Sequence, residues 1–268
     1  MDEMHKCRLC GKQFPESEMS EEHYPAHCVG NDDIIQLNIV KAMDDLMSGH
    51  ARQAIVSGMK KGLSYEDAAG AYFDNELAKD LYPKGRTART LCRECNTFLG
   101  KYDSAYLRFY NANGDPAIVR GYQERTKIQI IKSIYAKFLS LPETQDENFD
   151  FIEFIKDESM SVYSGEWRLY FVKRDFSTDL MGLADIGTGK LDFEEGVVYE
   201  LSDDRFIFNL MNFEKHSCYE MNSIFDILNR NYSLIVGVGE NGGYHGQVML
   251  TDLFRQMQEQ DERREFFP

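Results

Sequence analysis

The sequence predicts an α+β fold in two parts. Residues 1–120 form a cysteine-containing part with a helical insertion at about 33–82, and residues 121–268 form an acidic part with a mostly antiparallel sheet. The first observation is length, because 268 residues suffice for one large domain or two ordinary ones. The second is charge: residues 1–120 carry 15 Lys and Arg against 18 Asp and Glu, whereas residues 121–268 carry 15 against 27. The third is that four of the six cysteines fall in the first part as two pairs.

Composition excludes several classes of protein. Hydrophobic residues make up 43% of the chain and charged residues 28%, which is typical of a globular protein rather than a disordered one. No apolar run approaches the roughly 18–20 residues that a membrane span requires. Residues 1–6 contain no apolar stretch of a secretory signal. We therefore expect no membrane association and a cytoplasmic location, where thiols stay reduced.

The paired cysteines predict a metal site. The pairs are Cys7-x2-Cys10 and Cys92-x2-Cys95, and Gly11 follows the first pair, as expected where a chain bends around a metal. Since disulfides are not expected in a reducing compartment, two such pairs indicate one structural Zn²⁺ bound by four thiolates.

Two further motifs adjoin these pairs. Glu22-His23 follows the first pair, and Asn96 follows the second directly in Cys-x2-Cys-Asn-x2-Leu-Gly. With these motifs, residues 5–110 resemble the zinc-stapled branch of the HNH endonucleases. The resemblance implies a ββα-metal fold, in which two short strands and a helix surround one catalytic divalent ion and zinc clamps the ends.

The residue types suit phosphodiester hydrolysis, which needs a base for water and a cation for the charge developing on phosphate. His23 titrates near neutrality and can accept the proton, and Glu22 offers the oxygen ligand that Mg²⁺ or Mn²⁺ prefers. Asn96 either brings a carbonyl oxygen to the metal or orients the loop that holds His23. The resemblance maps His23 onto the general base, and Glu22 and Asn96 onto metal-binding positions. Because neighbouring strand residues point to opposite faces, Glu22 and His23 can share one site only across a twist or bulge.

The sequence departs from the family pattern after Asn96, where the helix lacks the usual histidine. Asp103 is the nearest carboxylate that can replace it as a metal ligand, and the alternative is an ordinary surface carboxylate. His27 competes with His23 as the functional histidine. Pro25 between them disfavours a helix that would present both to one metal, so we favour His23.

The long insertion between His23 and Cys92 has a helical pattern. Apolar residues at 34, 37, 40 and 43 share one helical face, and further helices are expected over 52–61 and 68–81. Ser64 with Asp67 resembles a capping box before the last of these. A lid, a DNA-positioning element and a subunit contact all fit this insertion.

Basic residues gather where the insertion rejoins the second cysteine pair. We expect phosphate contacts there, most of all from Arg86 and Arg89, and the alternative is an ordinary solvated loop. The candidate nucleic-acid-binding residues are Lys84, Arg86, Arg89, Arg93, Lys101 and Arg108.

The acidic part carries no recognisable chemistry. An amphipathic helix is expected over 128–138. Strands are expected over 167–172, 183–186, 197–201, 205–211 and 232–238.

These observations lead to three hypotheses. The first is a metal-dependent endonuclease acting on DNA, with RNA as an alternative substrate. The second, by analogy with HNH proteins of bacterial antiviral defence, is a nuclease subunit that a partner ATPase or sensor activates. The third is a catalytically dead, zinc-stapled adaptor that binds nucleic acid or protein. The insertion or residues 121–268 would provide contacts for a homo-oligomer or a partner.

Overall fold

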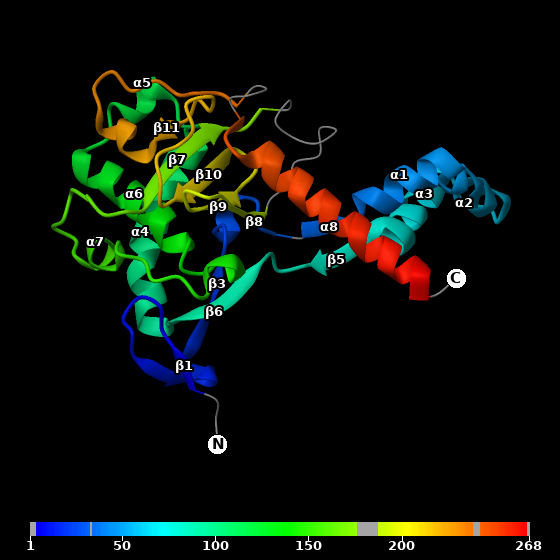
Figure 1. Ribbon diagram of the computed structural model, residues 1–268, viewed down its shortest axis with the longest axis horizontal. Helices are drawn as coiled ribbons and strands as arrows, with labels where there is room; N and C mark the ends of the chain where they lie inside the picture. Colours follow the sequence, from blue (N-terminus) through cyan, green and yellow to red (C-terminus); the bar gives the residue numbers. More distant parts are fainter. Residues whose placement is uncertain (1–3, 33, 176–186, 238–241, 267–268) are drawn as a thin grey trace. The chain divides into compact units, whose positions relative to one another are not determined.

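The computed structural model describes residues 4–32, 34–175, 187–237 and 242–266, which form two compact units (Figure 1). Unit 1 comprises residues 1–32 and 84–248, and unit 2 comprises residues 33–83 and 249–268. Helices and antiparallel strands occur together, which confirms the α+β class. Within the described ranges, every helix is too short or too polar to cross a bilayer.

The N-terminal part of unit 1 consists of two small strand pairs and a long helix. Strands β1 (Met4–Lys6) and β2 (Gln13–Pro15) form a hairpin, and a short 3-10 helix, η1 (Glu16–Glu18), leads to β3 (Met19–His23). A second 3-10 helix, η2, spans His27–Val29. Strand β6 (Thr87–Cys92) pairs antiparallel with β3 and runs directly into helix α4 (Arg93–Asn111). The chain thus places two paired strands ahead of a helix.

Helix α4 packs against helix α6 (Glu124–Lys137), and both belong to the main hydrophobic core. The connecting segments contain α5 (Pro116–Val119), the 3-10 helix η4 (Pro142–Thr144) and α7 (Ile152–Lys156). The expected helix over 128–138 is confirmed in α6, which ends one residue earlier. The core does not divide at residue 120, because α4 and α6 share it. The domain boundary expected there from charge stays a prediction about independent folding.

A five-stranded antiparallel sheet forms the rest of unit 1, in the order β11-β7-β10-β9-β8. Its strands are β7 (Arg168–Lys173), β8 (Thr188–Asp192), β9 (Val197–Ser202), β10 (Phe206–Met211) and β11 (Asn222–Ser223), followed by the 3-10 helix η7 (Ile224–Leu228). The expected strands over 167–172, 197–201 and 205–211 are confirmed. The expected strand over 183–186 lies outside the described residues. Over 232–237 the structure has only an isolated bridge between Lys173 and Val236, so that expectation was wrong for the described part.

Each face of the sheet has its own apolar cluster. Phe109 of α4 contacts one face, with its ring centroid 4.9 Å from that of Phe206 and 5.9 Å from that of Phe171. On the other face, Tyr244 and Val248 belong to a cluster with Val172 of β7. Burial on both faces explains why β10 is apolar except at Asn209, whereas the equally buried β9 also contains Glu200 and Ser202.

One arginine ties the N-terminal turn to the end of α6. The guanidinium of Arg8 donates to the backbone oxygens of Leu139 (3.0 Å), Thr144 (2.6 Å) and Glu147 (3.2 Å), and to Oγ1 of Thr144 (2.9 Å). Segments from both halves of the chain are therefore joined by one side chain.

Unit 2 is mostly helical. It contains α1 (Ile39–Ser48), α2 (His50–Lys60), α3 (Tyr65–Tyr72), a π-helical turn η3 (Phe73–Leu77) and the part of α8 (His245–Phe266) that follows residue 248. Ser64 caps α3 as expected: its hydroxyl accepts from the backbone N of Asp67 (3.0 Å) and donates to the Asp67 carboxylate (2.7 Å).

Two segments expected to be helical are strands instead. Strand β4 (Ile34–Leu37) pairs antiparallel with β5 (Ala78–Tyr82), so the first helix begins at Ile39 and the last helical turn ends at Leu77. Apolar spacing in a short segment does not distinguish a strand from a helix, and the pairing partner is distant in sequence. The hairpin-like pair closes the base of the insertion.

Candidate functional site

The four paired cysteines meet in one cluster. The sulfur atoms of Cys7, Cys10, Cys92 and Cys95 all lie within 4.8 Å of one another. A tetrahedral zinc ion with Zn–S bonds of about 2.3 Å would place its sulfurs roughly 3.8 Å apart. Burial raises the pKa of Cys10 and of Cys95, whereas hydrogen bonds from the backbone outweigh burial at Cys7 and lower its pKa, and a bound cation would favour the thiolate form of all of them. The cluster can therefore hold one zinc ion.

Local backbone geometry helps to bring the four cysteines together. Gly11 has φ +75°, and its N–H donates to the carbonyl of Cys7 (2.8 Å), which bends the chain after Cys10. At the other pair, the N–H of Cys92 donates to Sγ of Cys7 (3.3 Å) where β6 passes into α4. A zinc ion here would join the β1–β2 turn to the start of α4.

The imidazole of His23 is held by a backbone carbonyl. Its Nε2 lies 3.0 Å from the oxygen of Lys84, which only accepts, so Nε2 carries the proton and Nδ1 keeps the lone pair. Burial lowers the pKa of His23, and this outweighs the hydrogen bond to the Lys84 carbonyl, which raises it; electrostatic interactions with His27 and Lys137 lower it further. His23 is thus suited to act as a neutral base through Nδ1.

Asn31 fixes the loop that supplies this carbonyl, and the sequence alone did not single it out. Its fully buried side chain donates from Nδ2 to the oxygens of Pro25 (2.7 Å) and Arg86 (3.0 Å) and accepts at Oδ1 from the N–H of Arg86 (2.6 Å). Gly85 has φ +73°, and a Cβ there would lie 2.1 Å from the Asn31 carbonyl oxygen. Asn and Gly in a loop are common turn residues, so nothing in the pattern distinguished these two.

Glu22 and Asp103 meet at a third residue, Lys137 of α6. The ammonium group of Lys137 donates to Oε1 of Glu22 and, at 2.9 Å, to Oδ2 of Asp103. Ser133, one turn earlier on α6, donates to Oδ1 of Asp103 (2.8 Å). The register of β3 against β6 shifts between Ser20 and Glu22, whereas Glu22 and His23 follow in consecutive register, so the irregularity lies before Glu22 and not between the two residues as expected. The structure thus brings Asp103 to Glu22.

In the group formed by Glu22, Asp103 and Lys137, burial and the neighbouring charges shift the pKa values in opposite directions. Burial raises the pKa of Glu22, although the Lys137 ammonium opposes that shift. Burial alone would lower the pKa of Lys137, but the charges of Asp103 and Glu22 outweigh it, and the net shift is upward. Lys137 therefore stays a cation between two carboxylates.

The remaining polar candidates are Asn96 and His27. Asn96 donates from Nδ2 to Oγ of Ser20 (2.7 Å), which braces the first turn of α4 against β3. His27 packs edge-on to His23, with ring centroids 5.2 Å apart, and its exposed Nε2 lies 3.4 Å from Oδ1 of Asp32. The Asn96 amide thus contacts the strand that carries His23, and both functions considered for Asn96 stay predictions.

Several of the basic candidates are already bound to acidic side chains or to a backbone carbonyl, so they do not form one patch that is available to phosphate. Arg89 pairs with Glu16 (2.7 Å) and Glu21 (3.2 Å), and Arg93 donates to the carbonyl of Ser17 (2.9 Å). Lys84 and Arg86 lie on the loop before β6, and Arg108 is exposed near the end of α4. Phosphate binding by these residues stays a prediction.

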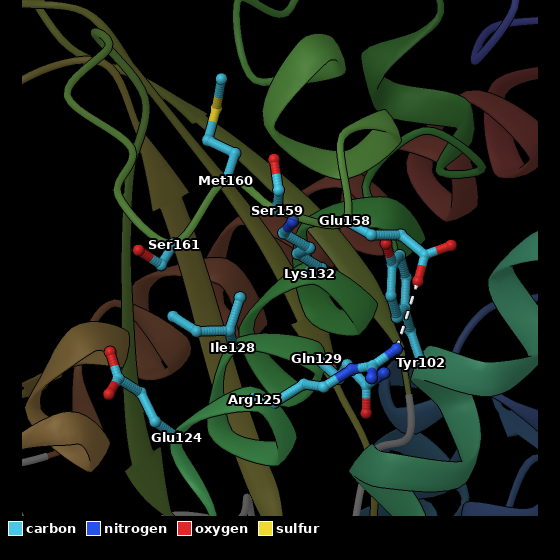
Figure 2. A pocket seen from close by; sticks show the side chains of 10 residues that line it. All are labelled: Tyr102, Glu124, Arg125, Ile128, Gln129, Lys132, Glu158, Ser159, Met160 and Ser161. Carbon is cyan, nitrogen blue, oxygen red and sulfur yellow. Dashed lines mark ion pairs between the residues drawn. The ribbon is translucent and has the colours of Figure 1, made fainter.

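Lys101 pairs with Glu158 beside a separate pocket between α4, α6 and the segment after α7. Figure 2 shows Glu158 and Arg125 paired at its margin, with Lys132 of α6 further inside. The distance between the paired atoms of Arg125 and Glu158 is 3.5 Å. This pocket contains none of the residues around His23.

Comparison with family models, with curated proteins and with solved structures finds no match for this chain.

Proposed function

We propose that this protein is a metal-dependent endonuclease that hydrolyses phosphodiester bonds in DNA. One observation supports this most: a four-cysteine cluster joins the ends of a two-strand and helix arrangement that presents a histidine and two carboxylates. The histidine and one carboxylate come from β3, and the other carboxylate comes from α4. The HNH resemblance supplies the reaction class.

In the proposed reaction, Nδ1 of His23 accepts a proton from the attacking water. The Lys84 carbonyl keeps Nε2 protonated and holds the ring in one orientation. The same carbonyl stabilises the imidazolium that forms. Asn31 keeps that carbonyl in place through its contacts to Arg86.

Glu22 and Asp103 would hold the divalent ion, and the resemblance adds the Asn96 carbonyl as a further oxygen ligand. Two carboxylates from separate elements suit Mg²⁺ or Mn²⁺, which prefer oxygen ligands. When bound, such an ion would neutralise the charge that develops on the phosphate. Ser133 orients the Asp103 carboxylate for this purpose.

Plasmid nicking by zinc-loaded protein with Mg²⁺ or Mn²⁺ tests the proposal. His23→Ala should lower the cleavage rate by roughly 10²–10⁴-fold, while zinc content and folding stay unchanged. His27→Ala is the matched control, because His27 is an exposed histidine only four residues further along the chain, at the start of η2, and this variant should keep most of the activity. A reversed pattern would mean that His27 is the base. Full activity in both variants would refute the proposed site.

A second candidate is the same activity in a subunit that needs a partner. Unit 2 favours this candidate, because Leu46 and Met47 of α1 are 75% and 87% exposed, and exposed apolar patches often mark protein interfaces. The same nicking assay separates the two candidates. Cleavage by the purified chain alone contradicts a requirement for a partner.

A further inference from the structure

Lys137 gives the proposed metal site an unusual feature, because a side chain already supplies a cation there. Glu22 is 4% exposed and Lys137 is 6% exposed, so water contributes little to solvating this ion pair. Both oxygens of Asp103 are engaged, Oδ1 by Ser133 and Oδ2 by Lys137. Asp103 is more accessible, with 22% of its side chain exposed, but the buried Glu22 carboxylate beside it would be strongly unfavourable without a cation, and the ammonium removes much of that cost.

The ammonium and a divalent ion require the same space. Nζ of Lys137 contacts Glu22 Oε1 and lies 2.9 Å from Asp103 Oδ2. A Mg²⁺ or Mn²⁺ ion shared by these two oxygens would lie about 2.0–2.2 Å from each. A second cation cannot occupy that gap beside the first, since repulsion and overlap both oppose it.

Charge balance favours replacement over addition. Two carboxylates carry two negative charges, and one ammonium neutralises only half of that charge. A divalent ion would neutralise the pair fully.

We propose that Lys137 and the divalent ion compete for one position between Glu22 and Asp103. Lys137 is then a positioning residue that keeps the carboxylates in place without the ion and weakens the affinity for the ion. The inference rests on the proposed function in one respect, because it assumes that these carboxylates bind a divalent ion. Sequence reasoning assigned nothing to Lys137, which belongs to α6 rather than to the metal motif.

Mn²⁺ binding to the full zinc-loaded chain, measured without substrate by the spin-resonance signal of free Mn²⁺, tests the inference. Lys137→Met keeps a long side chain and removes the charge, and it should bind Mn²⁺ roughly tenfold more tightly or more. Lys132→Met is the matched control: Lys132 is also buried on α6, but its ammonium donates to the carbonyl of Asp157 instead. Its Mn²⁺ affinity should equal that of the unsubstituted chain.

Thermal unfolding provides a second measurement. Lys137→Met should unfold at a lower temperature than the unsubstituted chain without Mn²⁺, because the buried Glu22 and the partly buried Asp103 lose their counterion. It should gain more stability than the unsubstituted chain when Mn²⁺ is added. Equal or weaker Mn²⁺ affinity in folded Lys137→Met would overturn the inference.

A second pair of variants, in which only one carboxylate remains, keeps the test decisive if Lys137→Met does not fold. Glu22→Gln with Lys137→Met should bind Mn²⁺ more tightly than Glu22→Gln alone, and equal affinity overturns the inference. The outcomes also separate the two proposals. Cleavage by the unsubstituted chain with no affinity change in Lys137→Met refutes only the competition, whereas tighter Mn²⁺ binding without cleavage in any preparation refutes only the nuclease.

Discussion

Units 1 and 2 distribute apolar and polar side chains in opposite ways. In unit 1, aromatic residues of α4 are buried against the sheet, and Phe109 is fully buried. In unit 2, all ten residues of α1 are described and only Asp45 is buried, whereas Leu46 and Met47 lie in solvent. Asp45 accepts from Lys41 (2.6 Å) and from the hydroxyl of Tyr72 (2.8 Å). Unit 1 is therefore stabilised by its own core, while unit 2 has a polar interior contact and an apolar outer surface.

Close helix packing in unit 2 does not compensate for this small core. Helices α2 and α3 approach at Gly58, where a Cβ would lie 2.9 Å from Cβ of Ala68. Of the apolar residues described on these two helices, Ala68 is buried and Val56 and Met59 are exposed. The contrast between the units can be tested by removing what stabilises each.

Removing zinc should have the largest effect. Structural zinc sites contribute on the order of 10 kcal/mol to folding, so chelation or Cys92→Ser should unfold the β1–β2 turn and the start of α4. Amides of α1–α3 should keep their hydrogen-exchange protection, because no cluster cysteine lies in unit 2. Metal analysis should find about one zinc per chain, and Cys218→Ser, an exposed cysteine outside the cluster, is the control. Folded, zinc-free protein would contradict the prediction.

Truncating the aromatic core of unit 1 should have the second-largest effect. Phe109→Ala removes a ring that contacts Phe171 and Phe206, and we expect a loss of about 3–5 kcal/mol in the free energy of unfolding. Urea denaturation measures this loss. Ile118→Ala on α5, where the side chain is 48% exposed, should cost far less. Similar losses in both variants would show that unit 1 is not stabilised mainly by this core.

The pH dependence of unit 1 should reveal a buried acid. Burial raises the pKa of Asp203 to about 7, although Tyr106 and two backbone N–H groups donate to its carboxylate. Because the folded-state pKa lies above the unfolded value near 3.8, its contribution is complete below pH 3.8 and is lost as pH rises through 7. Asp203→Asn should therefore gain stability relative to the unsubstituted chain over this window, by as much as about 4 kcal/mol. The free energy of unfolding of both proteins can be measured in urea between about pH 4 and 8. If the two values change with pH in parallel, the upward pKa shift of Asp203 is contradicted.

The apolar surface of unit 2 should give the smallest effect on folding. Leu46→Ser with Met47→Ser should change the free energy of unfolding by no more than about 0.5 kcal/mol, because both side chains are already in solvent. A drop of several kcal/mol in chemical denaturation would mean that these residues are packed in solution. That result would remove the contrast between the units.

The sequence predicted those parts of the molecule that depend on local spacing. The two cysteine pairs, the cap at Ser64 and the main strands of the sheet all follow from short patterns that the structure confirms. Strands β4 and β5 were missed because their pairing is long-range and their apolar spacing also suits a helix. Local pattern therefore identified the isolated elements better than their pairing.

The site shows the same limit more clearly. Lys137 is 115 residues from Glu22, and a lysine on an amphipathic helix usually reaches solvent. Only the packing of α6 against α4 turns this lysine inward. Asn31 and Gly85 were missed because their function is a backbone contact between two loops, which leaves no periodic signal.

The four hydrogen bonds of Arg8 link the four-cysteine cluster to the end of α6, so oxidation of the cysteines would affect α6 as well. Arg8 lies between Cys7 and Cys10 of the four-cysteine cluster, and its guanidinium donates to the carbonyl of Leu139, two residues beyond Lys137. Peroxide that oxidises Cys7 and Cys10 to a disulfide would release zinc and reshape the turn that positions this guanidinium. The end of α6 would then lose its hydrogen bonds to Arg8. The position of Lys137 between Glu22 and Asp103 would therefore depend on the redox state of thiols that these carboxylates do not contact.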